Sequence, residues 1–140
     1  MGVLVQPFVD GAVANGVAIT SNPFYERRPG FFVNAQSLGG SVTGAGGNEI
    51  PEQHIIYTYS EDIESELLSR SSRNGGEPLL RDPDIRRLTE VLAALDEHFV
   101  PLWQDRANAV DVEFLIAGPN RDVIVLQARP FLVHYHDAEE

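Results

Sequence analysis

Hydrophobic and polar residues alternate in short runs along most of the chain, a pattern typical of strands with one buried face. The runs are rich in Val, Ile and Phe and are bounded by Gly, Pro or Asn. They predict strands over residues 2–9, 16–21, 30–36, 54–59, 109–116 and 123–129. Residues 117–122 carry Gly, Pro and Asn between the last two runs, so we expect a hairpin loop there.

One longer segment has helical periodicity instead. Asp82 and Pro83 are typical of a helix start, and Pro101 is expected to end or kink the helix near Val100. Apolar residues recur between them on one helical face: Ile85, Leu88, Val91, Leu92, Leu95, Phe99 and Leu102. A second, short helix is expected to begin at Ser60. The fold class is therefore α+β, with a mostly antiparallel sheet and helices packed on one face.

The composition is ordinary for one globular domain. Of 140 residues, 43% are hydrophobic and 22% are charged. We expect residues 1–133 to form the domain and residues 134–140 to form a polar tail. No apolar run approaches the length of a membrane span, and the first residues lack the features of a secretory signal, so we expect a cytoplasmic protein. The absence of cysteine excludes disulfides, thiolate metal sites and cysteine nucleophiles.

The charge of the chain limits its partners. A formal net charge of −11 repels nucleic acids and anionic membranes. Arginine supplies all 10 basic residues, so no lysine can form a Schiff base or hold a phosphate. A polyanionic ligand would therefore require a bound metal or a few well-placed arginines.

The last hairpin carries polar residues that can meet on one face. A hairpin centred on Asn120 places Glu113 opposite Gln127 and Asp111 opposite Arg129, and directly opposed side chains share a face. The other face would then be apolar: Val112, Phe114, Ile116, Ile124, Leu126 and Ala128. A shift of one residue in the register would destroy this division.

These residue types permit metal and phosphate chemistry. The Glu113 carboxylate and the Gln127 carbonyl are hard oxygen ligands suited to Mg²⁺, which keeps few protein ligands beside phosphate and water. Arg129 could fork onto a phosphate group. The other interpretation is an ordinary amphipathic hairpin with a solvent-exposed ion pair between Asp111 and Arg129. Spacing alone favours this second interpretation.

Several motifs of the chain occur in the same order in a known family. Residues 3–9 (V-L-V-Q-P-F-V), residues 16–23 (G-V-A-I-T-S-N-P) and residues 32–36 (F-V-N-A-Q) match its early strands. Residues 111–114 (D-V-E-F) and residues 126–130 (L-Q-A-R-P) match its closing hairpin. On these motifs, residues 3–130 resemble the second half of the ATP-binding domain in the pyruvate phosphate dikinase and phosphoenolpyruvate synthase family.

The resemblance implies an ATP-grasp fold, in which two subdomains close on ATP. It implies that Glu113 and Gln127 hold Mg²⁺ and that Arg129 contacts the β- and γ-phosphates as the catalytic residue. Gln6 and Phe8 would lie on the hinge strand, whose backbone meets the adenine. The implied partners are an N-terminal ATP-grasp subdomain and a mobile domain whose histidine accepts the phosphoryl group. The whole parent protein would be an ATP-dependent phosphotransferase, and this chain alone would be inactive.

One departure supports an alternative function. Where the family has L-G-E, this chain has Leu38, Gly39 and Gly40, so a glycine replaces the glutamate. The alternative is a non-catalytic nucleotide-sensing or interaction domain that retains the ATP-grasp fold.

Overall fold

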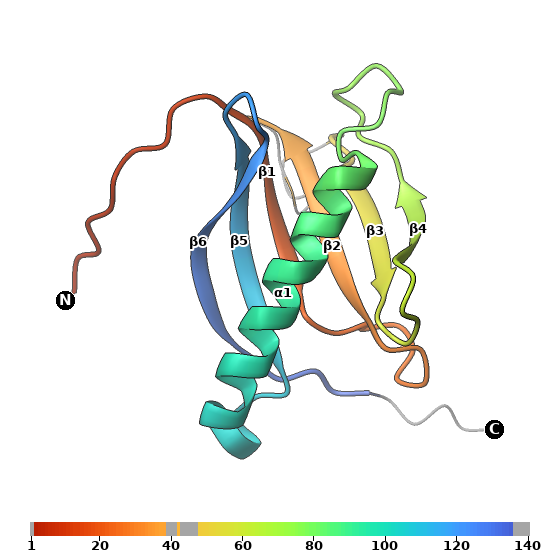
Figure 1. Cartoon of the computed structure of the whole chain (residues 1–140), viewed down its shortest axis with the longest axis vertical. Helices are drawn as coiled ribbons and strands as arrows, with labels where there is room; N and C mark the ends of the chain where they lie inside the picture. The colour runs from red at the N-terminus through yellow and green to blue at the C-terminus, as the bar shows by residue number, and fades with distance from the viewer. Residues whose placement is uncertain (1, 39–41, 43–47, 136–140) are drawn as a thin grey trace.

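A computed structural model describes residues 2–38, 42 and 48–135. Six antiparallel strands form one sheet in the order β4-β3-β2-β1-β5-β6 (Figure 1). The strands are β1 (Ala12–Ile19), β2 (Gly30–Ser37), β3 (Glu52–Tyr57), β4 (Glu64–Ser69), β5 (Ala109–Ala117) and β6 (Asp122–Phe131). One helix, α1 (Asp82–Trp103), crosses one face and is followed by the short 3₁₀-helix η1 (Gln104–Arg106). The α+β class and the antiparallel sheet are confirmed.

The predicted strand over residues 2–9 is wrong. Residues 2–10 have no regular structure and run away from the sheet (Figure 1). Their apolar side chains are almost fully exposed, for example Val3 at 82% and Phe8 at 90%. A strand needs a neighbouring strand to pair its backbone groups, and no strand in the described part of the chain pairs with these residues.

The prediction of a short helix from Ser60 is wrong, and the long helix ends later than expected. Residues 59–62 form a bend, and the chain then enters β4, because pairing with β3 outweighs the helix-start signal at Ser60. The helix α1 continues past Pro101 to Trp103. The ring of Trp103 stacks on Phe99 at 5.3 Å between centroids, which keeps the last turn packed despite the proline.

The core lies between α1 and the sheet face that it covers. Side chains alternate between the two faces, and β1 presents only small residues to the helix: Ala14, Gly16 and Ala18. The larger buried side chains come from the neighbouring strands and from α1: Val33, Val112, Phe114, Ile116, Ile85, Leu88 and Leu92. None of the helices in the described residues is long and apolar enough to cross a bilayer.

Gly16 is required by its neighbour on β5. Gly16 lies opposite Phe114, and a Cβ atom on Gly16 would be 2.2 Å from the Phe114 Cζ atom. The ring, which is 1% exposed, therefore occupies the space that any side chain at position 16 would need. This contact sets β1 and β5 in register and fixes which face each residue of β5 occupies.

The buried carboxylate of Glu52 links the loop before α1 to the sheet. Glu52, on β3, is 1% exposed and accepts hydrogen bonds from the backbone N–H groups of Leu79 and Leu80, at 2.7 and 2.9 Å. It also pairs with His54 Nε2 at 2.8 Å. Burial acts to raise the pKa of Glu52, but these hydrogen bonds outweigh it and the net pKa is lowered.

Replacing Gly16 with alanine should destabilise the protein. The added methyl group must displace the Phe114 ring or the backbone of β1, which costs about 1–3 kcal/mol for overpacking in a core. Urea unfolding followed by circular dichroism measures the change. Gly2→Ala is the control, because a Cβ atom at Gly2 meets nothing within 4 Å. Equal stability of the two variants would contradict the packing described.

Glu52 should make the protein less stable in acid. Its folded-state pKa lies below its ordinary value of 4.5, so its contribution is present above that pH and is lost as the pH falls through the folded-state pKa. Glu52→Gln should cost about 1–3 kcal/mol at neutral pH and should flatten the decline of stability below pH 4.5. Unfolding free energies measured across this pH range test the prediction, with the exposed Glu90→Gln as the control. A decline that is unchanged in Glu52→Gln would disprove it.

Candidate functional site

The uncovered face of the sheet brings the predicted hairpin residues together. Glu113 on β5 lies opposite Gln127 on β6, and Asp111 lies opposite Arg129, so the expected register is confirmed at both pairs. The Arg129 Nε–H donates to Asp111 Oδ2 at 2.7 Å. These side chains alternate with buried Val112, so all four project from the face opposite to α1.

A bulge alters the register beyond Glu113. Phe114 lies opposite Val125 and Leu115 lies opposite Ile124, so Leu126 is an extra residue on β6. The prediction that Ile124 shares the apolar face with Phe114 is therefore wrong, and Ile124 lies on the same face as Leu115. Alternation of apolar and polar residues alone cannot reveal a bulge. The position of this bulge matters for the hairpin site. It adjoins the Glu113 and Gln127 pair and twists β6 locally.

A row of residues extends from this pair across the sheet and is polar except at Val17, and we call it the polar band: Gln127, Glu113, Val17, Asn34 and Gln53. Val17 on β1 lies opposite Glu113, Asn34 on β2 lies opposite Val17, and Gln53 on β3 lies opposite Asn34. The Gln53 Nε2 group donates to Asn34 Oδ1 at 2.6 Å. Hydrophobic periodicity predicts no role for Gln53, because the pairing of β2 with β3 depends on a long connection that periodicity cannot resolve.

Arg129 supplies a positive charge on this face. The hydrogen bond and the charge of Asp111, and then the charge of Glu113, raise the pKa of Arg129 and keep it protonated. The Arg129 side chain is 61% exposed, whereas Asp111 is 15% exposed. The less exposed Asp111 carboxylate thus fixes the position of the more exposed Arg129 guanidinium. The N–H groups of Arg129 other than Nε–H make no hydrogen bond within the described part of the chain.

Glu113 and Gln127 can hold a divalent cation only if phosphate oxygens and water complete its coordination shell. Both side chains are exposed, and within the described residues neither has a hydrogen-bond partner. No group of three or more His, Cys, Asp or Glu side chains in that part of the chain could hold a metal. One carboxylate and one amide oxygen suit Mg²⁺ if phosphate oxygens and water complete its shell. The residues therefore fit a metal that arrives with a phosphate.

The structure does not bring Gln6 and Phe8 to this hairpin. Both lie on the exposed segment that leaves the sheet before β1. The chain turns at Gly11, which has a positive φ of 72° and whose carbonyl accepts a hydrogen bond from Gly118 N–H at 3.0 Å. The role expected for Gln6 and Phe8 thus stays a prediction. Gly40 lies outside the described residues.

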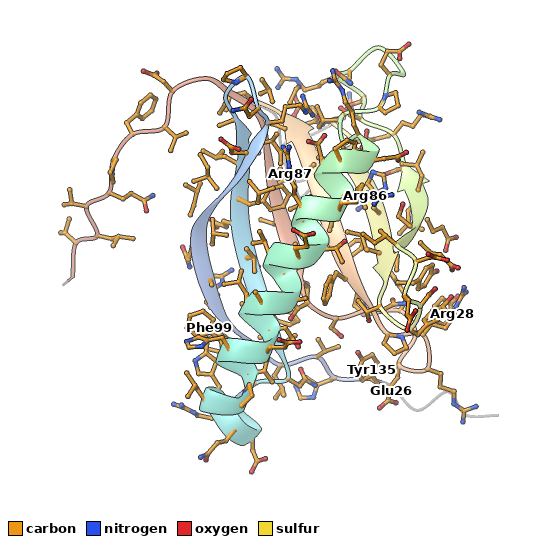
Figure 2. The ribbon with its side chains drawn as sticks, in the orientation of Figure 1. Glu26, Arg28, Arg86, Arg87, Phe99 and Tyr135 are labelled. Atoms are coloured by element: carbon orange, nitrogen blue, oxygen red, sulfur yellow. The ribbon has the colours of Figure 1, made fainter. Side chains whose placement is uncertain are left out.

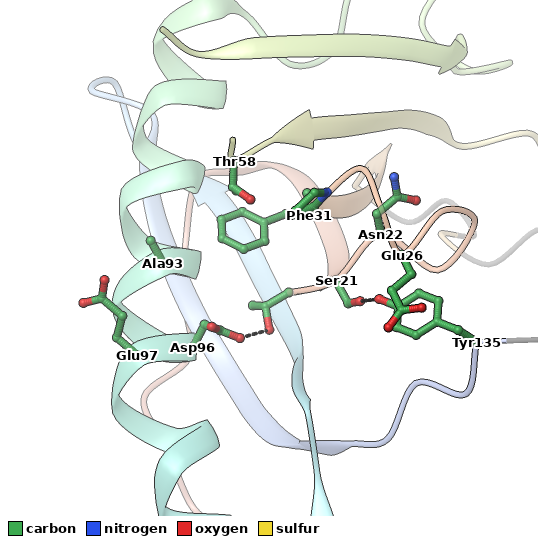
Figure 3. Close-up of a pocket in the computed structure, with 12 residues that line it drawn as sticks. Ser21, Asn22, Glu26, Phe31, Thr58, Ala93, Asp96, Glu97 and Tyr135 are labelled. Carbon is green, nitrogen blue, oxygen red and sulfur yellow. Dashed lines mark hydrogen bonds between the residues drawn. The ribbon is translucent and has the colours of Figure 1, made fainter. Parts of the chain in front are cut away.

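A cavity of about 420 Å³ lies on the other side of the sheet, beside α1 (Figure 3). Three of its lining side chains are carboxylates: Glu26, Asp96 and Glu97. Thr20 Oγ1 donates to Asp96 at 2.7 Å. Ser21 hydrogen-bonds Tyr135. This second bond holds residues 134 and 135 of the expected tail near the sheet. The cavity shares no lining residue with the polar band.

The sequence matches no protein-family model, and it matches no curated protein. The geometry of the open face and the order of the sequence motifs are therefore the features of this chain that indicate a function.

Removing the Arg129 charge should leave stability unchanged. Arg129 lies on the solvent-exposed face, where an ion pair contributes little to folding. We expect Arg129→Gln to unfold at the same temperature as the unmodified protein in differential scanning calorimetry. Arg121→Gln is the contrasting variant, because Arg121 forks onto Asp84, which is 1% exposed, and should unfold at a lower temperature. A large fall for Arg129→Gln would indicate that this residue is structural.

Proposed function

We propose that the chain is the metal- and phosphate-binding half of an ATP-grasp nucleotide site in a dikinase-like phosphotransferase. The observation that carries the proposal is the open-face arrangement of Glu113, Gln127 and Arg129 on one hairpin. The same three residues fall in the D-V-E-F and L-Q-A-R-P motifs on which the family resemblance depends.

The roles of the residues follow from their chemistry. The Glu113 carboxylate and the Gln127 carbonyl oxygen would bind Mg²⁺, which neutralises charge on the β- and γ-phosphates. Arg129 would donate its exposed N–H groups to the transferring phosphoryl group, and so stabilise the charge that spreads over its oxygens. Asp111 keeps the guanidinium in this position through the 2.7 Å hydrogen bond. The chain itself supplies no phosphoryl acceptor in this proposal.

The chain supplies one side of the site. The open face is a single layer, and in the described residues nothing packs above Glu113 and Gln127 to enclose a nucleotide. An N-terminal subdomain would supply the opposite wall, and its basic residues would replace the lysine that this chain lacks. The acceptor would be a histidine on a mobile domain. Gln6 and Phe8 would contact the adenine once the segment over residues 2–9 is ordered by that subdomain.

Nucleotide titration tests the proposal. In ¹H–¹⁵N NMR spectra of the chain with Mg²⁺ and ATP, we expect weak, saturable shifts centred on Glu113, Gln127 and Arg129. Glu113→Gln and Gln127→Ala should each weaken binding by about tenfold, since each removes a metal ligand. ATP without Mg²⁺ should bind more weakly than ATP with it.

Glu90→Gln provides the matched control, because Glu90 is an exposed carboxylate on α1 and its replacement changes the net charge by the same amount. It should bind as the unmodified chain does. The proposal is refuted if Glu90→Gln and Glu113→Gln weaken binding equally, or if the shifts cluster around another surface. Rapid ATP hydrolysis by the chain alone would also refute the half-site proposal.

A further inference from the structure

A second pocket lies on the open face, at the end of the sheet away from β6. Its volume is about 320 Å³, which is at the lower limit of ligand pockets and suits one ring-sized molecule. The lining comes from the loop between β1 and β2 and from strands β3 and β4: Asn22, Phe24, Tyr25, Arg28, Ile55, Tyr57, Glu66 and Leu68. Arg28 lies at this end of the molecule, remote from the N-terminal segment (Figure 2).

The walls of the pocket are mainly aromatic and aliphatic. Phe24 contacts Phe32 edge to face, with 5.3 Å between ring centroids. Tyr57 forms the floor with Ile55, and both are buried. Phe24 and Tyr25 nonetheless remain 57% and 61% exposed. Two exposed aromatic side chains beside an apolar floor offer surface on which a further ring can pack.

The loop that carries these rings is held in shape. Asn22 is 2% exposed, and its side chain donates to the Arg28 carbonyl at 2.9 Å and accepts from Phe24 N–H at 3.0 Å. Tyr25 also accepts a backbone hydrogen bond from Arg28 at 3.2 Å. Both ends of the segment from Phe24 to Arg28 are therefore closed on Asn22. A preformed wall lowers the entropic cost of binding.

The pocket has one cationic and one anionic side chain. The Arg28 guanidinium lies 4.7 Å above the centre of the Tyr57 ring and forms no ion pair within the described residues. A side-chain hydrogen bond with Tyr59, and to a smaller extent the charge of Glu66, raise the pKa of Arg28. The Glu66 carboxylate, on β4, accepts a hydrogen bond from Tyr57 Oη, and its other oxygen keeps its acceptor capacity. A ligand that carries an aromatic ring, one anionic group and one cationic group would match the aromatic walls, Arg28 and Glu66.

We propose that this pocket binds a zwitterionic aromatic compound of the size of a free aromatic amino acid. Its carboxylate pairs with Arg28, its ammonium pairs with Glu66, and its ring lies against Tyr25 and Leu68. The pocket is separate from the phosphate site. Three strand spacings, about 14 Å, lie between Ile55 and Asp111, which occupy one row across the sheet. The ligand is a second molecule, because a nucleotide carries no ammonium group to pair with Glu66.

A ligand series on the unmodified chain tests each part of the proposal. NMR titrations without metal or nucleotide compare L-phenylalanine with 3-phenylpropionate, 2-phenylethylamine and L-alanine, which lack the ammonium, the carboxylate and the ring, respectively. We expect L-phenylalanine to shift the signals of Tyr25 and Leu68 and each analogue to bind at least about tenfold more weakly. Absence of saturable binding of L-phenylalanine, or equal binding of either singly charged analogue, would overturn the proposal.

Matched variants test the two charged residues. Arg28→Gln and Glu66→Gln should each weaken L-phenylalanine binding about tenfold. Arg27→Gln and Glu64→Gln change the same charges on the same loop and strand, outside the pocket, and should bind normally. Calorimetric unfolding verifies that each variant is folded. Equal losses in Arg28→Gln and Arg27→Gln would assign the effect to overall charge. Because nucleotide is absent, these outcomes do not depend on the function proposed for Glu113 and Gln127.

Discussion

The contact between the Phe114 ring and Gly16 is the constraint on which the rest of the structure depends. The ring fills the space over the glycine, so in the observed register of β1 and β5 no side chain fits at position 16 without displacing it. That register turns Phe114 toward α1 and Glu113 toward solvent, since neighbouring residues of a strand face opposite sides. The same register thereby separates the core under α1 from the open face that carries the four hairpin side chains. The bulge that follows Glu113 adjusts β6 beside the same pair.

Much of the fold and the hairpin site could be predicted from local sequence. Asp111 and Arg129 were paired correctly because alternation and the loop near Asn120 determine a hairpin register. The strand predicted over residues 2–9 is wrong, because strand-like composition does not supply a pairing partner. The bulge at Leu126 was not predictable, because an apolar residue there fits either register. The aromatic pocket depends on a turn that the Asn22 side chain closes. Hydrophobic periodicity does not reveal such side-chain contacts.

The distribution of charge reconciles an acidic chain with an anionic ligand. The net charge of −11 belongs to the whole surface, whereas binding depends on the local field around Arg129. Asp111 orients that arginine, and a cation between Glu113 and Gln127 would reverse the sign of the remaining charge. The acidic cavity beside α1 has no arginine in its lining and cannot serve an anion in this way. The two faces of the sheet therefore differ in the ligands that they can accept.

Anomalous diffraction from crystals grown with Mn²⁺ and ADP would test the central claim most directly, because manganese replaces Mg²⁺ at oxygen sites and is located without reference to any proposed role. The account predicts one manganese peak on the open face, bonded to the Glu113 carboxylate and the Gln127 carbonyl oxygen, with a phosphate of the nucleotide beside Arg129. Manganese bound among Glu26, Asp96 and Glu97, with the open face empty, would contradict it.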